Sequence, residues 1–268
     1  MSSPPRTLKI GLVGFGNFAQ FLAKTMLKHG HTLTATSRTD YSDLCLQLGI
    51  LFFRIPVSFL EANNDVIVFC TSILSLSDVI KAMPLNVLKK PTLFVDVLSV
   101  NQHPRDLLLQ ELPEDSDVLC THPMFGPESG KNGWKDLAFV FDRVRIQNEA
   151  LCSSFLQIFA GEGCRMVEMS CEEHDELAAQ SQFLAHTIGR ILAETRTEST
   201  SINTRGFETL LHLKENTLRD SFDLYKGLFM HNKFAARELE KLEVALQKVK
   251  QKLLEGTNEE PNIGLANH

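Results

Sequence analysis

Two features of this chain combine residue types and spacings that suggest chemistry, and the first is a glycine-rich turn. Gly14, Gly16 and Ala19 form a G-x-G-x-x-A motif at the end of the apolar run LKIGLVGF. In such a motif the first glycine permits a tight turn, the second lets the backbone approach a pyrophosphate, and the third position packs a helix against the sheet. The N-terminus of that helix favours an anion. The motif predicts dinucleotide binding, and a glycine turn without a ligand is the alternative.

The second feature is a histidine, His122, in the stretch CTHPMFGPESGKNGW that begins at Cys120. Proline and glycine interrupt this stretch too often for a helix, and it is too irregular for a strand. Histidine is the side chain whose ordinary pKa suits a general base near neutral pH. A structural histidine with satisfied hydrogen bonds is the alternative.

The elements that position these residues are strands alternating with helices in the first half of the chain. The apolar runs that predict strands are LKIGLVGF, HTLTATSRTD, DVIVFCTS, TLFVDVLS and DVLCTHP. This alternation is typical of an α/β fold with a Rossmann-type, doubly wound parallel sheet. Ligands of such sheets bind outside the carboxyl ends of the strands. The residues at these strand ends and in the first helical turn are candidates to bind the cofactor: Asn17, Phe18, Ser37, Thr71 and Ser72. Ser99 and His122 lie at the ends of the last two predicted strands.

The end of the second strand predicts which cofactor binds. An NAD site usually has Asp or Glu there to hold the ribose 2′-hydroxyl, whereas this chain has Ser37, Arg38 and Thr39. A guanidinium flanked by hydroxyls suits a 2′-phosphate, so NADP is favoured. The alternative is that Arg38 is a solvated charge and that Asp40 binds the ribose.

From about residue 148 the chain is expected to be helical, with a last candidate strand in CRMVEMS. The run CEEHDELAAQSQFLAHTIGRILAET places His174, Gln182 and His186 on one polar helix face. Amphipathic stretches after residue 206 predict a homodimer contact. The expected units are a dinucleotide-binding domain over 1–147, an all-α substrate-binding and dimerisation domain over 148–256, and a disordered tail over 257–268.

Composition excludes several classes of protein. The chain has 27 basic and 33 acidic residues, a net charge of -6, which argues against a nucleic-acid partner. No apolar run reaches the ~18 residues of a membrane span. The six cysteines form no C-x-x-C pair, which predicts reduced thiols and no metal site. A strand is expected so soon after Met1 that no leader peptide is predicted, and a cytoplasmic location is expected.

With these residues in view, the sequence resembles the arogenate/prephenate dehydrogenase family in its plant form, over about residues 8 to 245. The resemblance rests on GLVGFGNFAQFLAKT, TATSRTDYS, FVDVLSVNQHP, CTHPMFGPESGKNGW, EEHDELAAQSQFLAHTIGR, INTRGFETLL and DSFDLYKGLF. Members oxidatively decarboxylate a cyclohexadienol, giving tyrosine from arogenate or 4-hydroxyphenylpyruvate from prephenate. The short N-terminus resembles that of a cytosolic branch that includes prephenate users.

The resemblance implies roles for particular residues. His122 is expected to take the proton of the substrate hydroxyl, and Ser99 to bind that hydroxyl or to orient His122. Gln182, His186 and Thr204 match positions that face the substrate. The alternatives are a packing role for His186 and a helix cap for Thr204.

Further residues in both halves of the chain are compared with the family pattern. Arg205 is a weaker candidate for the substrate carboxylate, because the arginine motif of bacterial members is absent. Asn101 departs from the lysine that many members carry after SV. His174 and Asp175 are interpreted as structural, as an N-terminal capping pair.

Asp220, in LRDSFDL, is expected to favour arogenate, because its carboxylate would attract the side-chain ammonium of arogenate and repel dianionic prephenate. The alternative is that Asp220 caps the following helix, with Ser221 as the other candidate cap. Prephenate dehydrogenase is therefore the second candidate activity. A β-hydroxyacid dehydrogenase would need a catalytic lysine that HDELAAQSQFLAH lacks, and intact Ser99 and His122 argue against an inactive NADP-binding regulator.

Overall fold

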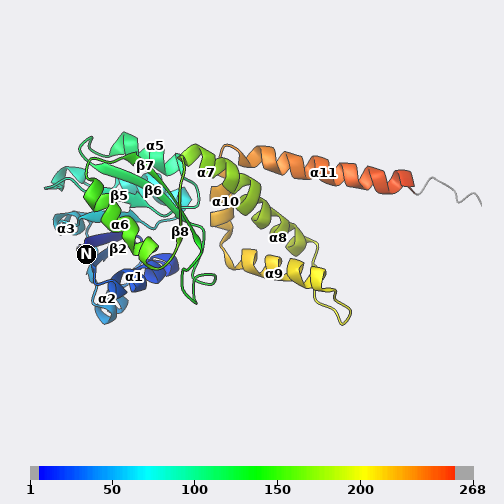
Figure 1. Ribbon diagram of the computed structural model, residues 1–268, viewed down its shortest axis with the longest axis horizontal. Helices are drawn as coiled ribbons and strands as arrows, with labels where there is room; N and C mark the ends of the chain where they lie inside the picture. Colours follow the sequence, from blue (N-terminus) through cyan, green and yellow to red (C-terminus); the bar gives the residue numbers. More distant parts are fainter. Residues whose placement is uncertain (1–5, 257–268) are drawn as a thin grey trace, which may run out of the picture.

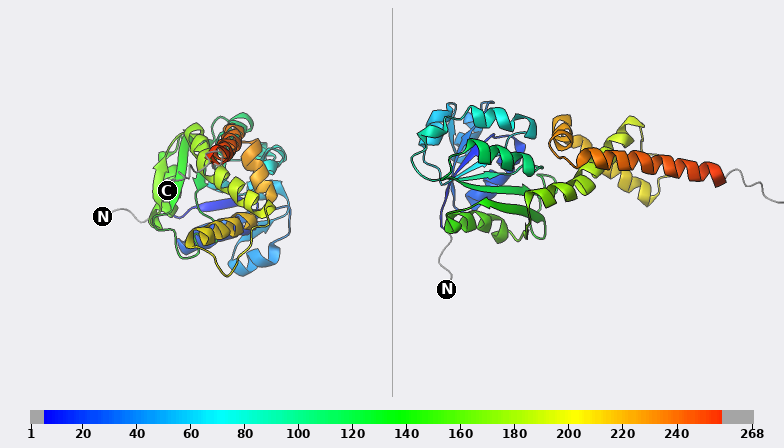
Figure 2. Two further views of the ribbon diagram at one scale, coloured as in Figure 1. Left: turned by 90° about the vertical axis from the view of Figure 1, so that its right-hand side faces the viewer. Right: turned by 90° about the horizontal axis from the view of Figure 1, so that it is seen from above.

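The computed structural model describes residues 6–256, so the tail expected over 257–268 lies outside the described residues. A sheet flanked by helices forms one end of the molecule, and a group of helices projects from it (Figure 1). The view from above in Figure 2 shows the sheet between its covering helices and α11 running away from it.

The sheet confirms the predicted doubly wound architecture. Its eight strands lie in the order β3-β2-β1-β4-β5-β6-β7-β8, and the pairs are parallel apart from β6 with β7. The order reverses between β1 and β4, which makes their carboxyl ends the switch point where ligands bind. The strands are β1 Lys9–Val13, β2 Thr32–Thr36, β3 Leu51–Phe53, β4 Val66–Phe69, β5 Leu93–Asp96, β6 Asp117–Pro123, β7 Ala138–Arg145 and β8 Arg165–Glu168.

Both faces of the sheet are buried, which explains why its central strands are continuous apolar runs. In β4, Val66 and Val68 pack into one apolar cluster, while Ile67 and Phe69 pack into the cluster on the opposite face. One face is covered by α1 Asn17–Lys28, α2 Ser42–Leu48 and α6 Glu149–Gly161. The other is covered by α3 Pro56–Glu61, α4 Leu76–Lys81 and α5 Gln102–Glu111, with the short turns η1 Ile73–Ser75 and η2 Leu85–Val87.

The sheet-containing half extends past the boundary expected at residue 147. Helix α6 packs Phe155 and Phe159 into the core on one face, and β8 then pairs in parallel with β7. The candidate strand in CRMVEMS is therefore confirmed as part of the same sheet. Its partner β7 carries Asp142 and Arg143, which break the apolar pattern that predicts a strand.

The helical half begins at α7 and carries the long polar run. Helix α7 Cys171–Ala178, the π-helical turn η3 Ala179–Phe183 and α8 Leu184–Glu194 follow one another without a break. Single π-turns inside α-helices occur frequently at functional sites, because the wider turn changes the direction of the side chains. The remaining helices are α9 Arg205–Arg219, α10 Phe222–Met230 and α11 Ala235–Gly256.

Candidate active site

The turn after β1 has the backbone that a dinucleotide requires. Gly14 has a φ of 87°, and a Cβ at this position would lie 2.8 Å from the carbonyl oxygen of Cys70. A Cβ on Gly16 would meet no atom within 4 Å, so the approach to the N-terminus of α1 is open. Across the switch point, Thr71 Oγ1 is buried without a hydrogen-bond partner. An open helix N-terminus facing an orphaned hydroxyl fits a dinucleotide pyrophosphate.

Three further predicted cofactor residues lie at the same edge. Asn17 is the first residue of α1, and the Phe18 ring packs at the core margin with its centroid 6.1 Å from that of Phe21. Ser72 Oγ lies 2.8 Å from Ser75 Oγ at the start of η1. Their contact with the cofactor stays a prediction.

Two arginines lie close together after the neighbouring strands β2 and β3. Only Arg38, which follows β2, was predicted from the sequence. Ser37 is half-buried, and Arg38 and Thr39 are exposed. Arg54, which follows β3, donates from Nη1 to the Arg38 carbonyl oxygen at 3.2 Å. It was missed because β3 has three residues and lies outside the apolar runs that predict strands.

Asp40 is engaged with the start of α2. Its Oδ1 accepts a hydrogen bond from the Ser42 amide at 2.9 Å, and this bond lowers the pKa of the Asp40 carboxyl. One oxygen of this carboxylate therefore stabilises the first turn of α2. The contact of Arg38, Arg54 or Asp40 with the ribose end of a cofactor stays a prediction.

The predicted base and its neighbouring hydroxyl come from adjacent strands. His122 lies at the carboxyl end of β6 with 4% of its surface exposed. Ser99 is half-buried and follows β5, which pairs in parallel with β6 through Asp96 and Cys120. The two residues are therefore at one edge of the sheet, next to the strand ends that form the nucleotide turn.

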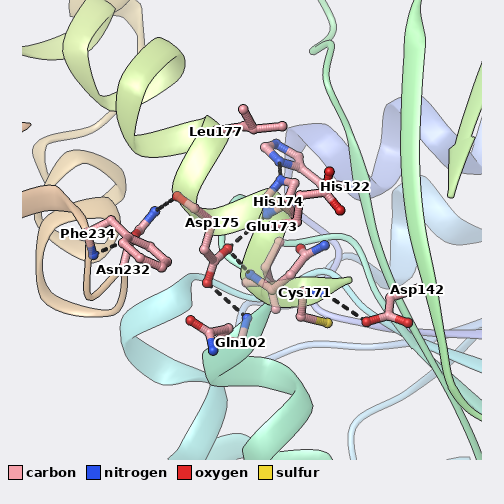
Figure 3. Close-up of polar contacts among 12 residues, drawn as sticks. Gln102, His122, Asp142, Cys171, Glu173, His174, Asp175, Leu177, Asn232 and Phe234 are labelled. Atoms are coloured by element: carbon pink, nitrogen blue, oxygen red, sulfur yellow. Dashed lines mark hydrogen bonds and ion pairs between the residues drawn. The ribbon is translucent and has the colours of Figure 1, made fainter. Parts of the chain in front are cut away.

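His122 is held by a chain of side chains from the helical half. Its Nδ1 lies 2.9 Å from Nε2 of His174, and His174 Nδ1 lies 2.8 Å from Oδ1 of Asp175. Figure 3 shows the His122 and His174 rings side by side, with Asp175 on the far side of His174 next to Gln102. His174 and Asp175 are thus neighbours of the candidate base. His174 and Asp175 do not cap their own helix, because Ser170 Oγ caps α7 by accepting from the Glu173 amide. Asp175 instead accepts from the two amides at the start of α5.

Burial determines the protonation of the candidate base. The pKa of His122 is lowered well below its ordinary value, first because the ring is buried and second because His174 lies beside it. A neutral imidazole at neutral pH is the form that accepts a proton. His174 is the partner of His122 Nδ1, and the role of Ser99 toward the substrate hydroxyl or toward His122 stays a prediction.

Three side chains form a ridge along the polar face of the long helix, and one of them, Arg190, was not predicted from the sequence. Gln182, His186 and Arg190 follow one another at four-residue steps through η3 and α8. Each has a buried polar atom without a hydrogen-bond partner: Gln182 Oε1, His186 Nδ1 and Arg190 Nε. Buried polar atoms are normally paired, so three orphans along one ridge indicate a ligand surface. Arg190 is the next step after His186 in the same pattern, which was the signal available in the sequence.

Arg190 is fixed beside the end of α9. Its Nη2 donates to the carbonyl oxygens of Asp220 and Ser221 at 3.1 and 3.2 Å. Its guanidinium also lies 5.3 Å from the ring centroid of Phe222 and 4.9 Å from that of Tyr225. Cation–π contacts and carbonyl hydrogen bonds together hold the planar group in one orientation.

Asp220 is not the cap of the following helix. Ser221 Oγ accepts from the Leu224 amide at 3.2 Å and caps α10, while Asp220 Oδ2 lies 3.6 Å from His186 Nε2. Burial lowers the pKa of His186, Asp220 raises it and Arg190 lowers it further. His186 is therefore mainly neutral at neutral pH and leaves the Asp220 carboxylate, 49% exposed, without charge compensation from this partner.

Two predicted residues lie apart from this ridge. Thr204 Oγ1 accepts from the Phe207 amide at 3.3 Å and caps α9, so the cap role weighed from the sequence is confirmed. Thr204 and the exposed Arg205 begin α9 at its end away from the sheet (Figure 1). Within a single chain, neither residue is brought to His122, and a substrate role for Thr204 stays a prediction.

Residues 6–256 contain neither a cluster of metal-binding side chains nor a membrane-spanning helix. In this range no group of three or more His, Cys, Asp or Glu side chains is arranged to hold a metal ion. No helix of the same range is long and apolar enough to cross a membrane. All six cysteines are free, and five of them are buried.

Comparison with protein families gives two matches. Residues 19–144 match the family described as prephenate dehydrogenase, nucleotide-binding domain. Residues 191–262 match the family described as TYRAAT1-like, C-terminal domain. The first match begins just after the Gly14–Gly16 turn and covers Arg38, Arg54 and His122.

Two plant proteins are similar over most of the chain. Arogenate dehydrogenase 1, chloroplastic, of Arabidopsis thaliana is 58% identical over 250 residues, which are 92% of this chain and 39% of that protein. Arogenate dehydrogenase 2, chloroplastic, of the same plant is 53% identical over 250 residues, which are 92% of this chain and 70% of that protein. The chain thus spans well under half the length of the first relative.

Solved structures show the same fold. Prephenate dehydrogenase from A. aeolicus, in complex with hydroxyphenyl propionate and NAD+, superposes with a TM-score of 0.76 at 15% identity, covering 95% of this chain and 93% of that one. Synechocystis arogenate dehydrogenase gives a TM-score of 0.59 at 17% identity, covering 94% and 98%.

Proposed function

The chain belongs to the arogenate dehydrogenase family, and on that premise we propose that it catalyses the NADP-dependent oxidative decarboxylation of arogenate to tyrosine. The observation that carries this proposal is the His122 site. A buried, neutral imidazole stands at the carboxyl edge of a dinucleotide-binding sheet and faces a helix with unsatisfied polar atoms. That arrangement suits removal of the proton from a hydroxyl group while a hydride leaves the carbon that carries this hydroxyl.

His122 acts as the general base through Nε2, because Nδ1 is bonded to His174. Ser99 binds the hydroxyl on the C4 carbon of the substrate and aims it at His122. When bound, NADP+ supplies the acceptor for the C4 hydride. Loss of the ring carboxylate as carbon dioxide then restores aromaticity and needs no acid or base from the protein.

The cofactor is held at the switch point. Gly14 and Gly16 admit the pyrophosphate to the N-terminus of α1, and Thr71 Oγ1 supplies a hydroxyl from β4. Arg38 and Arg54 bind the 2′-phosphate of NADP, because two planar multi-donor cations match a phosphate and no acidic residue competes directly at the end of β2.

The helical ridge binds the other end of the substrate. Arg190 binds the side-chain carboxylate, a role for which a guanidinium with a free Nε–H is suited. Gln182 and His186 hydrogen-bond the substrate between Arg190 and His122. Asp220, next to His186, attracts the side-chain ammonium of arogenate, which prephenate lacks.

Prephenate dehydrogenation to 4-hydroxyphenylpyruvate is the second candidate. It is favoured by the match of residues 19–144 to the prephenate dehydrogenase nucleotide-binding family and by the exposure of Asp220. A half-exposed carboxylate is screened by water, so its discrimination between the two substrates is smaller than a buried one would give.

We expect the protein to work as a homodimer joined through α11. Leu239, Leu242, Leu246, Val249 and Leu253 follow one another at alternating steps of three and four residues along this helix. This α11 seam has the spacing of a coiled-coil contact, yet Leu246 and Leu253 are 65% and 69% exposed. A second copy of the same helix would bury the seam.

Steady-state kinetics with arogenate and prephenate, each with NADP+ and NAD+, test the proposed function. The proposal requires the highest kcat/KM for arogenate with NADP+. A higher kcat/KM for prephenate would establish the second candidate, and no turnover of either substrate would reject both.

A further inference from the structure

We propose that His174 and Asp175 are positioning residues that fix the tautomer of His122, so that its Nε2 lone pair faces the substrate. The proposal rests on the proposed role of His122 as the base. It goes beyond that role, because it assigns to two residues of the helical half a function in the proton transfer made from the sheet.

The hydrogen-bonding pattern begins at Asp175, whose side chain is fully buried. Its Oδ1 accepts from the Asn101 amide at 2.7 Å and lies 2.8 Å from His174 Nδ1. Its Oδ2 accepts from the Gln102 amide at 3.0 Å. Both backbone donors are at the N-terminus of α5, where an anion is favoured. A carboxylate that receives two amide hydrogens in this position is an acceptor toward its third neighbour as well.

His174 Nδ1 must therefore carry the hydrogen that points to Asp175. A neutral imidazole has one N–H and one lone pair, so His174 Nε2 carries the lone pair. That lone pair faces His122 Nδ1 at 2.9 Å, and His122 Nδ1 must donate. By the same rule, the lone pair of neutral His122 is on Nε2. Each proton position follows from the hydrogen bond before it, starting from the backbone of α5.

The same chain serves the reaction after the proton moves. The O–H bond of the substrate breaks, its electron pair stays on oxygen, and an N–H bond forms at His122 Nε2. The imidazolium keeps its Nδ1–H directed at His174, and the negative charge of Asp175 lies at the other end of the chain. His122, His174 and Asp175 are 4%, 2% and 0% exposed, so water does not screen this charge or compete for the hydrogen bonds.

The position of Asp175 also joins the two halves of the molecule. Its side chain holds the start of α5, two residues after Ser99, and its carbonyl oxygen accepts from Asn232 Nδ2 at 2.7 Å. Other titratable side chains at this junction come from the sheet, α5, α7 and the α10–α11 link: Asp96, Cys120, Asp142, His103, Cys171 and His231.

Nitrogen-15 spectra of the histidine rings test the tautomer without using activity. In wild-type enzyme labelled on histidine, with His122 assigned from the spectrum of H122N, we expect a protonated Nδ1 and an unprotonated Nε2 at neutral pH. A protonated Nε2 in His122 would overturn the proposal, whether or not the enzyme oxidises arogenate. If the expected tautomer is found but the enzyme turns over neither substrate, the proposed function is rejected and the assignment of His174 and Asp175 as positioning residues is kept.

A matched pair of substitutions at residue 174 tests its role in turnover. H174F removes the acceptor for His122 Nδ1–H, and we expect kcat to fall by ~10²–10³-fold, within the usual range for positioned proton transfer. H174Q places an amide oxygen near the former Nε2 and should keep kcat within about tenfold of wild type, because an acceptor restores the hydrogen bond. Equal losses in the two variants would contradict the proposal.

Substitution of Asp175 tests the other end of the chain. D175N removes the negative charge and replaces one accepting oxygen by an N–H donor, so the side chain can no longer accept from His174 and from both α5 amides together. We expect a fall in kcat of ~10²–10⁴-fold with less than about threefold change in the Kd for NADP+. The control E173Q removes an exposed carboxylate two residues before Asp175 and should leave kcat unchanged. If D175N keeps the wild-type tautomer and kcat, the proposal fails; if it unfolds, the residue 174 pair decides.

Discussion

The sheet half and the helical half of this molecule bury their side chains to different extents. Every residue of β4 and β5 is buried, and apolar clusters cover both faces of the sheet. In contrast, α9 buries Thr217 alone among its residues, and the α11 seam is largely exposed. The sheet half is thus complete within one chain, whereas the helical half depends on contacts with the sheet at α7 and, as we propose, with a second copy at α11.

The difference also divides the chemistry. In the proposed function, the sheet half presents backbone and hydroxyl groups to a cofactor and one imidazole to the substrate. The helical half is proposed to supply the charged and amide side chains that distinguish one substrate from another. The two halves meet at the hydrogen bond between His122 and His174. Changes in this hydrogen-bonded chain should lower kcat, whereas changes at Arg190 should raise the KM for the substrate.

The largest effect is expected from His122. H122N should lower kcat by ~10²–10⁴-fold, because an amide cannot accept the substrate proton as a base does. The Kd for NADP+, measured by fluorescence titration, should stay within about twofold of wild type. A variant that keeps near-wild-type kcat would show that the base is elsewhere.

Dimerisation is the next largest expected effect. L246E places a charge in the α11 seam and should raise the dimer dissociation constant by ~10²-fold, since a buried unpaired charge costs several kcal/mol. Gln247 is adjacent and outside the seam, so Q247E adds the same charge as a control. Light scattering at micromolar protein should give a monomer for L246E and a dimer for wild type and Q247E. A wild-type monomer would reject the proposed contact.

Arg190 should set the affinity for the substrate. R190A is expected to lower kcat/KM for arogenate by ~10–100-fold, because a charge-assisted hydrogen bond contributes ~1.5–3 kcal/mol. R190K keeps the charge and loses the planar fork, so it should recover part of this loss. The loss should appear in KM, with the KM for NADP+ unchanged. A loss confined to kcat would contradict a binding role.

Cofactor choice should respond to the two arginines at the end of β2. R38A or R54A should raise the KM for NADP+ about tenfold and leave the KM for NAD+ unchanged, because NAD+ has no 2′-phosphate to lose a contact. K81A, an exposed cation on α4, is the control for net charge. Equal changes for the two cofactors would exclude a 2′-phosphate site.

The smallest effect is expected from Asp220. D220N should shift the ratio of the arogenate and prephenate efficiencies toward prephenate by less than about fivefold, because a contribution of under ~1 kcal/mol is typical of exposed charges. D223N, in the first turn of α10, is the matched control. An unchanged ratio would remove Asp220 from the specificity account and leave Arg190 and Gln182 as the next residues to test.

The same division explains how much could be predicted from the sequence. The central strands were predictable because burial on both faces makes them apolar throughout, as in VIVF of β4. The cofactor turn was predictable because Gly14 and Gly16 are close in sequence and each has a local backbone role. The strands β3 and β7 were not predicted, since β3 has three residues and β7 carries charges in its second half.

Contacts between distant residues set the limit in the active site. His122 and His174 are 52 residues apart and meet because α7 packs against α5 and β7, beside the end of β6. The residues that surround His174 and Asp175 in the sequence CEEHDEL do not show whether the pair caps a helix or orients a distant histidine. The sequence alone does not decide whether Asp220 or Ser221 caps α10. The hydrogen bond from the Leu224 amide to Ser221 Oγ identifies Ser221 as the cap.

The pH dependence of the first turnover tests the central claim, that a buried and neutral His122 is the base. NADPH formation in a single turnover with saturating arogenate should be measured from pH 4.5 to 9 in wild type and H122N. Because burial lowers the pKa of His122, the neutral form persists below the ordinary value of about 6.5. The wild-type rate should therefore stay level through pH 6.5 and fall only at lower pH, and H122N should lack this limb. A wild-type limb at or above pH 6.5, or the same limb in H122N, would contradict the account.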